Sequence, residues 1–247
     1  MQTPSTSTIL LSVILAGLLA GLVVGLFHYV VTEPVIEQAI TQESMAHPEE
    51  MDEPPVVTRD VQRVGGIIGW LLYGLFMGVL FGTAYALQRP RFGTDNLVVG
   101  GILAAVVAWW LVGLAPFLKY PANPPGVGDP ETITYRQTLF VLFWVLSIGG
   151  ALLAGWAHRL LRQHVTGLRL SGAVGVVYVA YVLALFVFLP ANPDPVSMPA
   201  DLVASFRALS LIGLSLYWLV LGVAFGLLLR ARTRPLPAGA RRWAPGS

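Results

Sequence analysis

The residues that could bind a metal ion gather near the start of the chain. His28 lies near the end of the first apolar run, five residues before Glu33, and its imidazole could face the inside of a helix bundle. Met45, His47 and Glu49 follow in a segment that offers thioether, imidazole and carboxylate together, which suits borderline divalent ions such as cobalt or nickel. The competing interpretation is a solvated acidic loop and a lone interfacial histidine. These five residues are the candidate metal ligands, although their spacing matches no specific metal motif.

A second set of polar residues lies in two proline-rich segments with related sequences. Residues 121–131 (PANPPGVGDPE) contain Asn123, and residues 190–195 (PANPDP) contain Asn192 at the matching position. We call these segments the first loop and the second loop. Because proline has no backbone N–H, each loop keeps free carbonyl groups beside the neutral amide oxygen of its asparagine. The two loops are therefore candidates for a substrate entrance.

An arginine stands just before the second, the fourth and the sixth apolar run of the chain: Arg63, Arg136 and Arg207. In the common interpretation, such a residue reaches the headgroup region and pairs with a nearby carboxylate. In a more specific interpretation, the arginines fix the shape of the loops by donating hydrogen bonds to carbonyls that the prolines leave unpaired. Unneutralised arginines would repel a cation, so a cation entrance requires the loop acids beside them. The candidate entrance residues are Asn123, Asn192, Arg63, Arg136, Arg207, Asp129 and Glu131.

Catalytic motifs are missing from the sequence. It contains no His-Glu-x-x-His, no Gly-x-Ser-x-Gly and no phosphate-binding glycine loop, and no carboxylate lies inside an apolar run. The chain also has no cysteine, which excludes disulfides and thiolate ligands. We predict that the protein is not an enzyme and has no resident cofactor.

The elements that carry these residues are apolar helices. Of 247 residues, 55% are hydrophobic and 11% charged, whereas a soluble domain has about 25% charged residues. The net charge of +2 gives no support for nucleic-acid binding. In lipid the backbone must satisfy its own hydrogen bonds, so uncharged runs of this length predict helices. We predict an all-α integral membrane protein with one membrane domain over 1–247, a long acidic loop over 32–63, and six transmembrane helices at about 9–31, 64–87, 97–118, 137–157, 171–189 and 208–229.

Glycines recur at every fourth position in the first two runs. Gly17, Gly21 and Gly25 form one stripe, and a second stripe is formed by Gly74, Gly78 and Gly82. Such stripes let another helix approach closely. We interpret both as packing surfaces.

The distribution of charge predicts the orientation. With the N-terminus inside, ten of the fifteen basic residues lie on the inner side and twelve of the thirteen acidic residues lie outside. Both termini are then cytoplasmic, and the six helices form three outward-pointing hairpins. Hairpins of equal orientation would be parallel pseudo-repeats, with approximate three-fold character and with their outer loops converging.

Three segments resemble one family. Residues 116–133 (PFLKYPANPPGVGDPETI), with Arg136 beyond, look like the outer-loop signature of the CbtA family, a predicted cobalt transporter subunit. Residues 199–202 (PADL), followed by Arg207, and residues 62–65 (QRVG) resemble its other recurring elements. The resemblance extends over nearly the whole chain.

This resemblance implies a multi-pass protein of the prokaryotic inner membrane that takes part in cobalt uptake. It also implies a partner, a small single-span CbtB-like subunit bearing histidines. We predict a subunit of a divalent metal transporter whose outer loops form the entrance and whose cargo is cobalt or a similar ion. Two alternatives stay open: a structural or assembly membrane protein that transports nothing, and a permease for a small organic anion.

Overall fold

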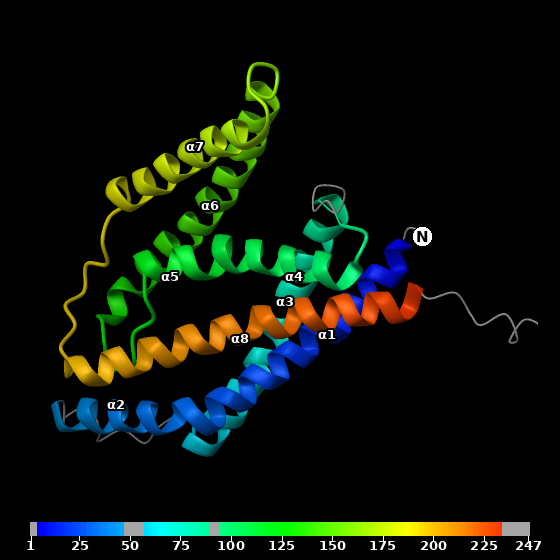
Figure 1. Ribbon diagram of the computed structural model, residues 1–247. Coiled ribbons are helices and arrows are strands. Elements are labelled where there is room, and N and C mark those ends of the chain that lie inside the picture. The colour runs from blue at the N-terminus through cyan, green and yellow to red at the C-terminus, as the bar shows by residue number, and fades with distance from the viewer. Residues whose placement is uncertain (1–3, 47–56, 89–93, 234–247) are drawn as a thin grey trace, which may run out of the picture. The chain divides into compact units, whose positions relative to one another are not determined.

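The structure is a computed structural model that describes residues 4–46, 57–88 and 94–233, and every regular element in these ranges is helical (Figure 1). Two of the elements are π-helical (η1 and η4) and one is a 3-10 helix (η5). In chain order the elements are α1 (Thr6–Phe27), η1 (His28–Thr32), α2 (Glu33–Ala46), α3 (Arg59–Gln88), α4 (Leu97–Ala108), η4 (Trp109–Leu114), α5 (Ala115–Lys119), η5 (Pro130–Thr132), α6 (Ile133–Leu161), α7 (Gly167–Phe188) and α8 (Ala200–Thr233).

Six helical stretches in the described chain are long and apolar enough to cross a membrane, which confirms the predicted helix number. Each predicted run lies inside one of them, apart from the last residue of the fifth run. The stretches are longer than the runs because a helix continues into water after its apolar part ends. They are Thr6–Ala46, Arg59–Gln88, Leu97–Lys119, Pro130–Leu161, Gly167–Phe188 and Ala200–Thr233.

The segment 32–63, expected to be a loop, is helical at both ends. α2 continues the first helix as far as Ala46, and α3 begins at Arg59. The acidic residues of α2 are interspersed with Ala, Ile, Gln and Met, which are acceptable or strong helix formers, and Ala39 is fully buried. His47 and Glu49 lie outside the described residues.

Contacts between residues divide the chain into two compact units. All four divisions fall inside helices, in α1, α3, α4 and α8. The prediction of a single membrane domain stays a prediction. Unit 1 comprises Met1–Leu26, Val64–Val106 and Leu216–Ser247, and unit 2 comprises Phe27–Arg63 and Val107–Ser215.

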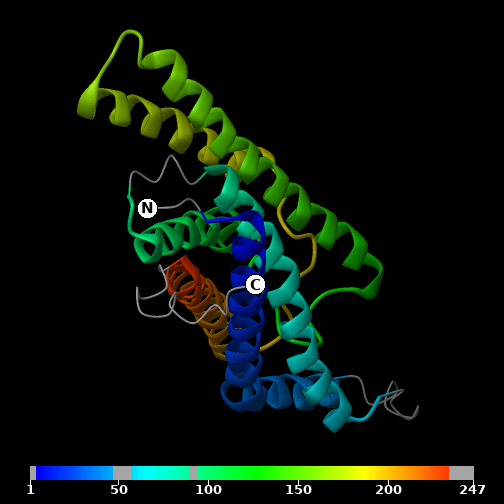
Figure 2. The same cartoon turned by 90° about the vertical axis from the view of Figure 1, so that its right-hand side faces the viewer.

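In unit 1, α1 and α3 pack through the two predicted glycine stripes. A methyl group on Gly17 would overlap the carbonyl oxygen of Gly74, and one on Gly21 would overlap that of Trp70. Numbers rise along one helix as they fall along the other, so the helices are antiparallel (Figures 1 and 2). Glycine is needed here because the two backbones touch. The predicted close approach is confirmed, and the glycine stripe of α1 packs against the glycine stripe of α3.

A second close approach in unit 1 joins α4 to α8. A Cβ on Gly101 would lie 2.9 Å from the carbonyl oxygen of Gly222, and one on Gly226 would lie 2.6 Å from Cα of Val98. The third predicted span therefore packs against the sixth, a pairing that sequence order does not indicate. Aromatic rings fill the rest of this unit in edge-to-face contacts that involve Tyr73, Phe81, Tyr85, Tyr217, Trp218 and Phe225.

In unit 2, α6 and α7 run antiparallel beside each other (Figures 1 and 2). Tyr181 of α7 lies against Gly150 of α6, and its hydroxyl donates to the carbonyl of Leu146 at 2.8 Å. Phe143 is fully buried beside Leu185 and belongs to a small apolar core at this level of the unit. This core supports the ends of the helices from which both loops leave.

Each π turn precedes a proline. In η1 the N–H of Glu33 bonds to the carbonyl of His28, and Pro34 follows. In η4 the N–H of Ala115 bonds to the carbonyl of Trp110, and Pro116 follows. A proline in a regular α-helix clashes with the carbonyl four residues before it, and the wider π turn lets the helix continue past this point.

The contact between α1 and α3 gives a matched test within one helix. Gly74→Ala should lower the thermal stability of the purified protein, because overpacking against Gly17 costs roughly 1–3 kcal/mol. The control Gly69→Ala adds the same methyl group where nothing lies within 4 Å, so it should be neutral or stabilising. Equal melting temperatures for the two variants would contradict this packing.

Candidate functional site

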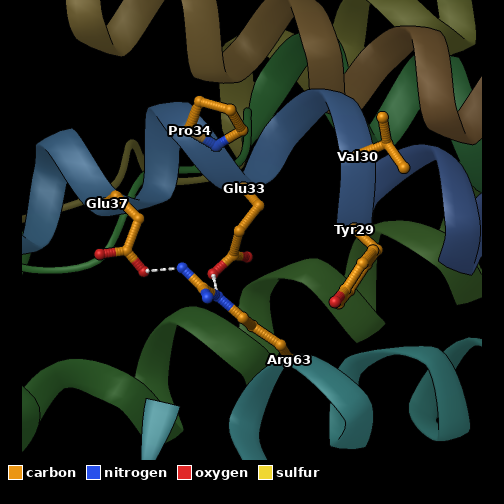
Figure 3. A pocket seen from close by; sticks show the side chains of 6 residues that line it. All are labelled: Tyr29, Val30, Glu33, Pro34, Glu37 and Arg63. Carbon is orange, nitrogen blue, oxygen red and sulfur yellow. Dashed lines mark hydrogen bonds and ion pairs between the residues drawn. The ribbon is translucent and has the colours of Figure 1, made fainter. Parts of the chain in front are cut away.

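Two glutamates of α2 and two arginines of α3 form a cluster of four ion pairs (Figure 3). Glu33 accepts from Arg59 at 2.6 Å and from Arg63 at 2.7 Å. Glu37 accepts from Arg59 at 2.8 Å and from Arg63 at 2.9 Å. The two glutamates are four residues apart, and so are the two arginines. Each helix therefore carries its two charged residues on one face. The two positive and two negative charges of the cluster balance.

A pocket of about 340 Å³ opens beside this cluster. Its charged wall consists of Glu33, Glu37 and Arg63, and its other wall of Tyr29, Val30 and Pro34 (Figure 3). Glu37 lies beyond the apolar run that ends at residue 31, and the hydrogen bond from Arg59 holds its pKa below the ordinary value of 4.5. The carboxylate is therefore ionised at neutral pH.

The arginines that follow the loops bind the loops reciprocally. Arg207, which follows the second loop, donates from Nη2 to Oδ1 of Asn123 in the first loop at 2.7 Å. Its Nε donates to the carbonyl of Ala122 at 3.3 Å. Arg136, which follows the first loop, lies with Nε 3.0 Å from Oδ2 of Asp194 in the second loop. Each loop is thus held by the arginine that comes after the other one.

Asp194 is the most buried charged group of this arrangement, with 4% of its side chain exposed. Thr132 donates from Oγ1 to its Oδ2 at 2.7 Å, and Asn192 accepts from its backbone N–H at 3.1 Å. Arg136 also donates to the carbonyl of Asp129 at 3.2 Å. Both interpretations of the arginines hold here, because Arg136 pairs with a carboxylate and donates to a carbonyl that precedes a proline.

Lys119 and Tyr120 supply further donors between the loops. Lys119 donates to the carbonyl of Phe186 at 2.9 Å. In a continuing helix that carbonyl would accept from residue 190, but Pro190 has no N–H. Tyr120 donates from its hydroxyl to the carbonyl of Pro190 at 2.7 Å. Carbonyls at the end of α7 and at the start of the second loop therefore receive their donors from the two residues that precede the first loop.

Three segments meet at Gly126 in the first loop. A Cβ there would lie 2.7 Å from Met198, in the connection to α8, and 2.8 Å from Glu43 of α2. The backbone φ of 77° also requires glycine. α2, the first loop and the segment after the second loop are thus in contact within unit 2.

His28 lies against α8. Its Nδ1 is 2.8 Å from Oγ1 of Thr32, and a methyl group on Gly213 would overlap its ring. Trp109, the first residue of the other π turn, donates to Oγ of Ser215 at 3.1 Å. Both π turns therefore begin with a ring that contacts the same turn of α8.

The structure describes three of the five predicted metal ligands, and each has a different environment. His28 bonds to Thr32, Glu33 is held by two arginines, and Met45 is 70% exposed on α2. No group of three or more His, Cys, Asp or Glu side chains that could hold a metal occurs in the described chain. Because His47 and Glu49 are outside that part, the five-residue ligand set stays a prediction.

The predicted entrance residues fall into two groups in the structure. Arg63 belongs to the glutamate cluster, whereas Asn123, Asn192, Arg136, Arg207 and Asp129 belong to the tied loops. Both asparagine oxygens accept hydrogen bonds from the protein, so each holds its loop in shape. The exposed Glu131 is the second residue of η5, and its N–H donates to Oδ1 of Asp129 at 2.8 Å.

Sequence analysis missed Asp194, Thr132 and Glu37 as members of these clusters. For Glu37 the signal was present, since it follows Glu33 by four residues as Arg63 follows Arg59. For Asp194 a weaker signal existed, because it is the acid inside the second copy of the repeated motif. Its contact with Arg136 joins residues 58 positions apart and has no local signature.

Together, the six candidate spans and the polar clusters define a multi-pass integral membrane protein. The family model described as "Probable cobalt transporter subunit (CbtA)" matches residues 6–230. The chain belongs to the CbtA family, a family of transporter subunits rather than enzymes. No curated protein and no solved structure matches the chain.

The glutamate cluster predicts a pH dependence of stability. Because the pKa of Glu37 is lowered in the folded protein, its ion pairs stabilise the fold above about pH 4.5 and are lost as the pH falls through the lowered value. Glu37→Gln should therefore melt below the wild type at pH 7, and the difference should be smaller at pH 3, below the ordinary pKa of 4.5. Thermal unfolding in detergent measures both.

The matched control is Asp60→Asn. Asp60 is 92% exposed and 3.7 Å from Arg63, so its loss should change the melting temperature little at either pH. A difference between Glu37→Gln and the wild type that is the same at pH 7 and pH 3 would count against the ion-pair explanation.

Proposed function

We propose that the chain is the integral-membrane subunit of a divalent metal uptake system, with cobalt as cargo, and that its outer segments form the entrance. Membership of the CbtA family supports the cargo. Two observations support an entrance at these segments. Arg136 and Arg207 bind the two loops reciprocally, and α2 contacts the first loop at Gly126. Loops held this closely present one continuous polar surface to an approaching ion.

The electrostatics of these segments favour a cation over an anion. Arg63 and Arg136 contact carboxylates, and Arg207 contacts the oxygens of Asn123 and Ala122. The positive charges are thereby neutralised or bound, as a cation entrance requires. A permease for an organic anion would need arginines available to the solute, so this arrangement supports the metal more than the anion.

The proposed topology has both termini in the cytoplasm, in the inner membrane of a prokaryotic cell. The excess of basic residues between the second and third, and the fourth and fifth, spans supports it. The three outward-pointing hairpins and their approximate three-fold character are part of this proposal. The meeting of three outer segments at Gly126 supports the convergence of the outer loops.

The metal-binding part of the proposal assigns ligands to His28, Glu33, Met45, His47 and Glu49, with a small single-span CbtB-like subunit as the partner. The description of the family as a transporter subunit supports a partner in general. In this arrangement the protein has no resident cofactor, and the metal ion is cargo.

Cobalt uptake into vesicles tests the proposal. Vesicles that contain the chain, with its partner where required, should take up radioactive cobalt faster than vesicles without it. Asn123→Ala should slow uptake severalfold, because it removes the acceptor of Arg207, and a hydrogen bond to a charged group contributes roughly 1.5–3 kcal/mol. Asn192→Ala should slow it as well.

The control is Asn96→Ala, which removes an asparagine oxygen outside both loops. Asn96 caps α4 by accepting from the N–H of Val98 at 3.0 Å, so its loss should cost about 1 kcal/mol of stability without slowing uptake. No cobalt uptake above empty vesicles in any combination would refute transport and favour a scaffold.

A further inference from the structure

The guanidinium of Arg136 lies in a cradle of oxygen atoms from both loops. Oδ2 of Asp194 is 3.0 Å from its Nε, the carbonyl of Asp129 accepts from its Nη2 at 3.2 Å, and Oγ1 of Thr132 bonds to the same Oδ2 at 2.7 Å. Gly128 lines the cradle with a φ of 100°, and a Cβ there would lie 2.6 Å from both Arg136 and Asp194. The cradle therefore has no room for another side chain.

The buried carboxylate of Asp194 needs a cation beside it. A carboxylate removed from water and left without a partner costs several kcal/mol. Arg136 supplies the positive charge, but its Nε–H is not aligned for a hydrogen bond to Oδ2 despite the short distance. The contact is ionic and lacks the paired, parallel hydrogen bonds that make an arginine–carboxylate pair specific.

The oxygen atoms of the cradle are suited to a different cation. The carboxylate of Asp194 and the backbone carbonyl of Asp129 are oxygen donors of the kind that bind divalent ions which keep part of their hydration shell. A spherical ion makes no demand on the direction of an N–H group. It would satisfy Asp194 without the misalignment that the guanidinium shows.

We propose that this cradle is the first cation-binding site of the chain, and that an incoming hydrated divalent ion takes the place of the Arg136 guanidinium. The site rests on the proposed function, since it names where the cargo first binds. The exchange keeps Asp194 paired throughout, and the displaced guanidinium, already 24% exposed, turns to solvent, where water and salt screen its charge. It also releases the tie between Arg136 and the second loop, so arrival of the ion loosens the loops that cover the entrance.

Equilibrium binding of radioactive cobalt(II) to the purified full-length chain in detergent tests this site. Arg136→Gln removes the resident cation and should tighten binding about tenfold, or about 1.4 kcal/mol. Asp194→Asn should weaken it by at least as much. Asp95→Asn, which neutralises an exposed acid outside both loops, is the matched control and should leave binding unchanged.

The double variant Arg136→Gln/Asp194→Asn separates binding from folding. It removes both charges and keeps polar groups of similar size, so it should melt near the wild type and bind cobalt as weakly as Asp194→Asn. Cobalt binding that ignores Asp194→Asn, or that weakens in a fully folded Arg136→Gln protein, overturns the site.

The uptake assay distinguishes the two proposals. If the chain drives cobalt uptake but binding does not depend on Asp194, this site is wrong and transport stands. If binding follows the expected order while no vesicle takes up cobalt, transport by the chain is wrong and the site stands.

Discussion

Proline at the helix ends beside the two loops is the constraint on which the structure of the loops depends. Each proline removes a backbone donor where a helix must end or turn, and the carbonyls that lose their partners must find others. Lys119 provides the donor for Phe186, and Tyr120, Arg136 and Arg207 donate to further carbonyls in or beside the loops. Hydrogen bonds to backbone carbonyls therefore help to hold the two loops together.

The sequence predicts the elements better than their partners. Uncharged runs of membrane-spanning length mark all six helices, because few other structures tolerate so many apolar residues in succession. A glycine stripe predicts that some helix approaches but not which one: Gly101 could have met any span, and it meets Gly222. α2 escaped detection because its acids suggested a solvated loop, although Glu33 and Glu37 share one helical face.

Several residues of the candidate site were identified from the sequence, but the contacts between them were not predicted. Asn123, Arg136 and Arg207 were identified as entrance residues from the repeated motif. That Arg136 meets Asp194 and Arg207 meets Asn123 depends on how α6, α7 and α8 fold back, which spacing along the chain does not encode. The same folding brings Asp194 to Arg136 and amide oxygen to Arg207, so the positive charges at the proposed entrance are neutralised or bound.

The π turn η1 also sets the direction in which α2 presents its side chains. A π turn holds one residue more than an α-helical turn, and one residue corresponds to about 100° of rotation around a helix axis. Without that additional residue, everything after Thr32 would be turned by this angle, and Glu33 and Glu37 would no longer face Arg59 and Arg63. The phase of the first membrane helix, and not only its length, thus decides whether its acidic extension can meet the second.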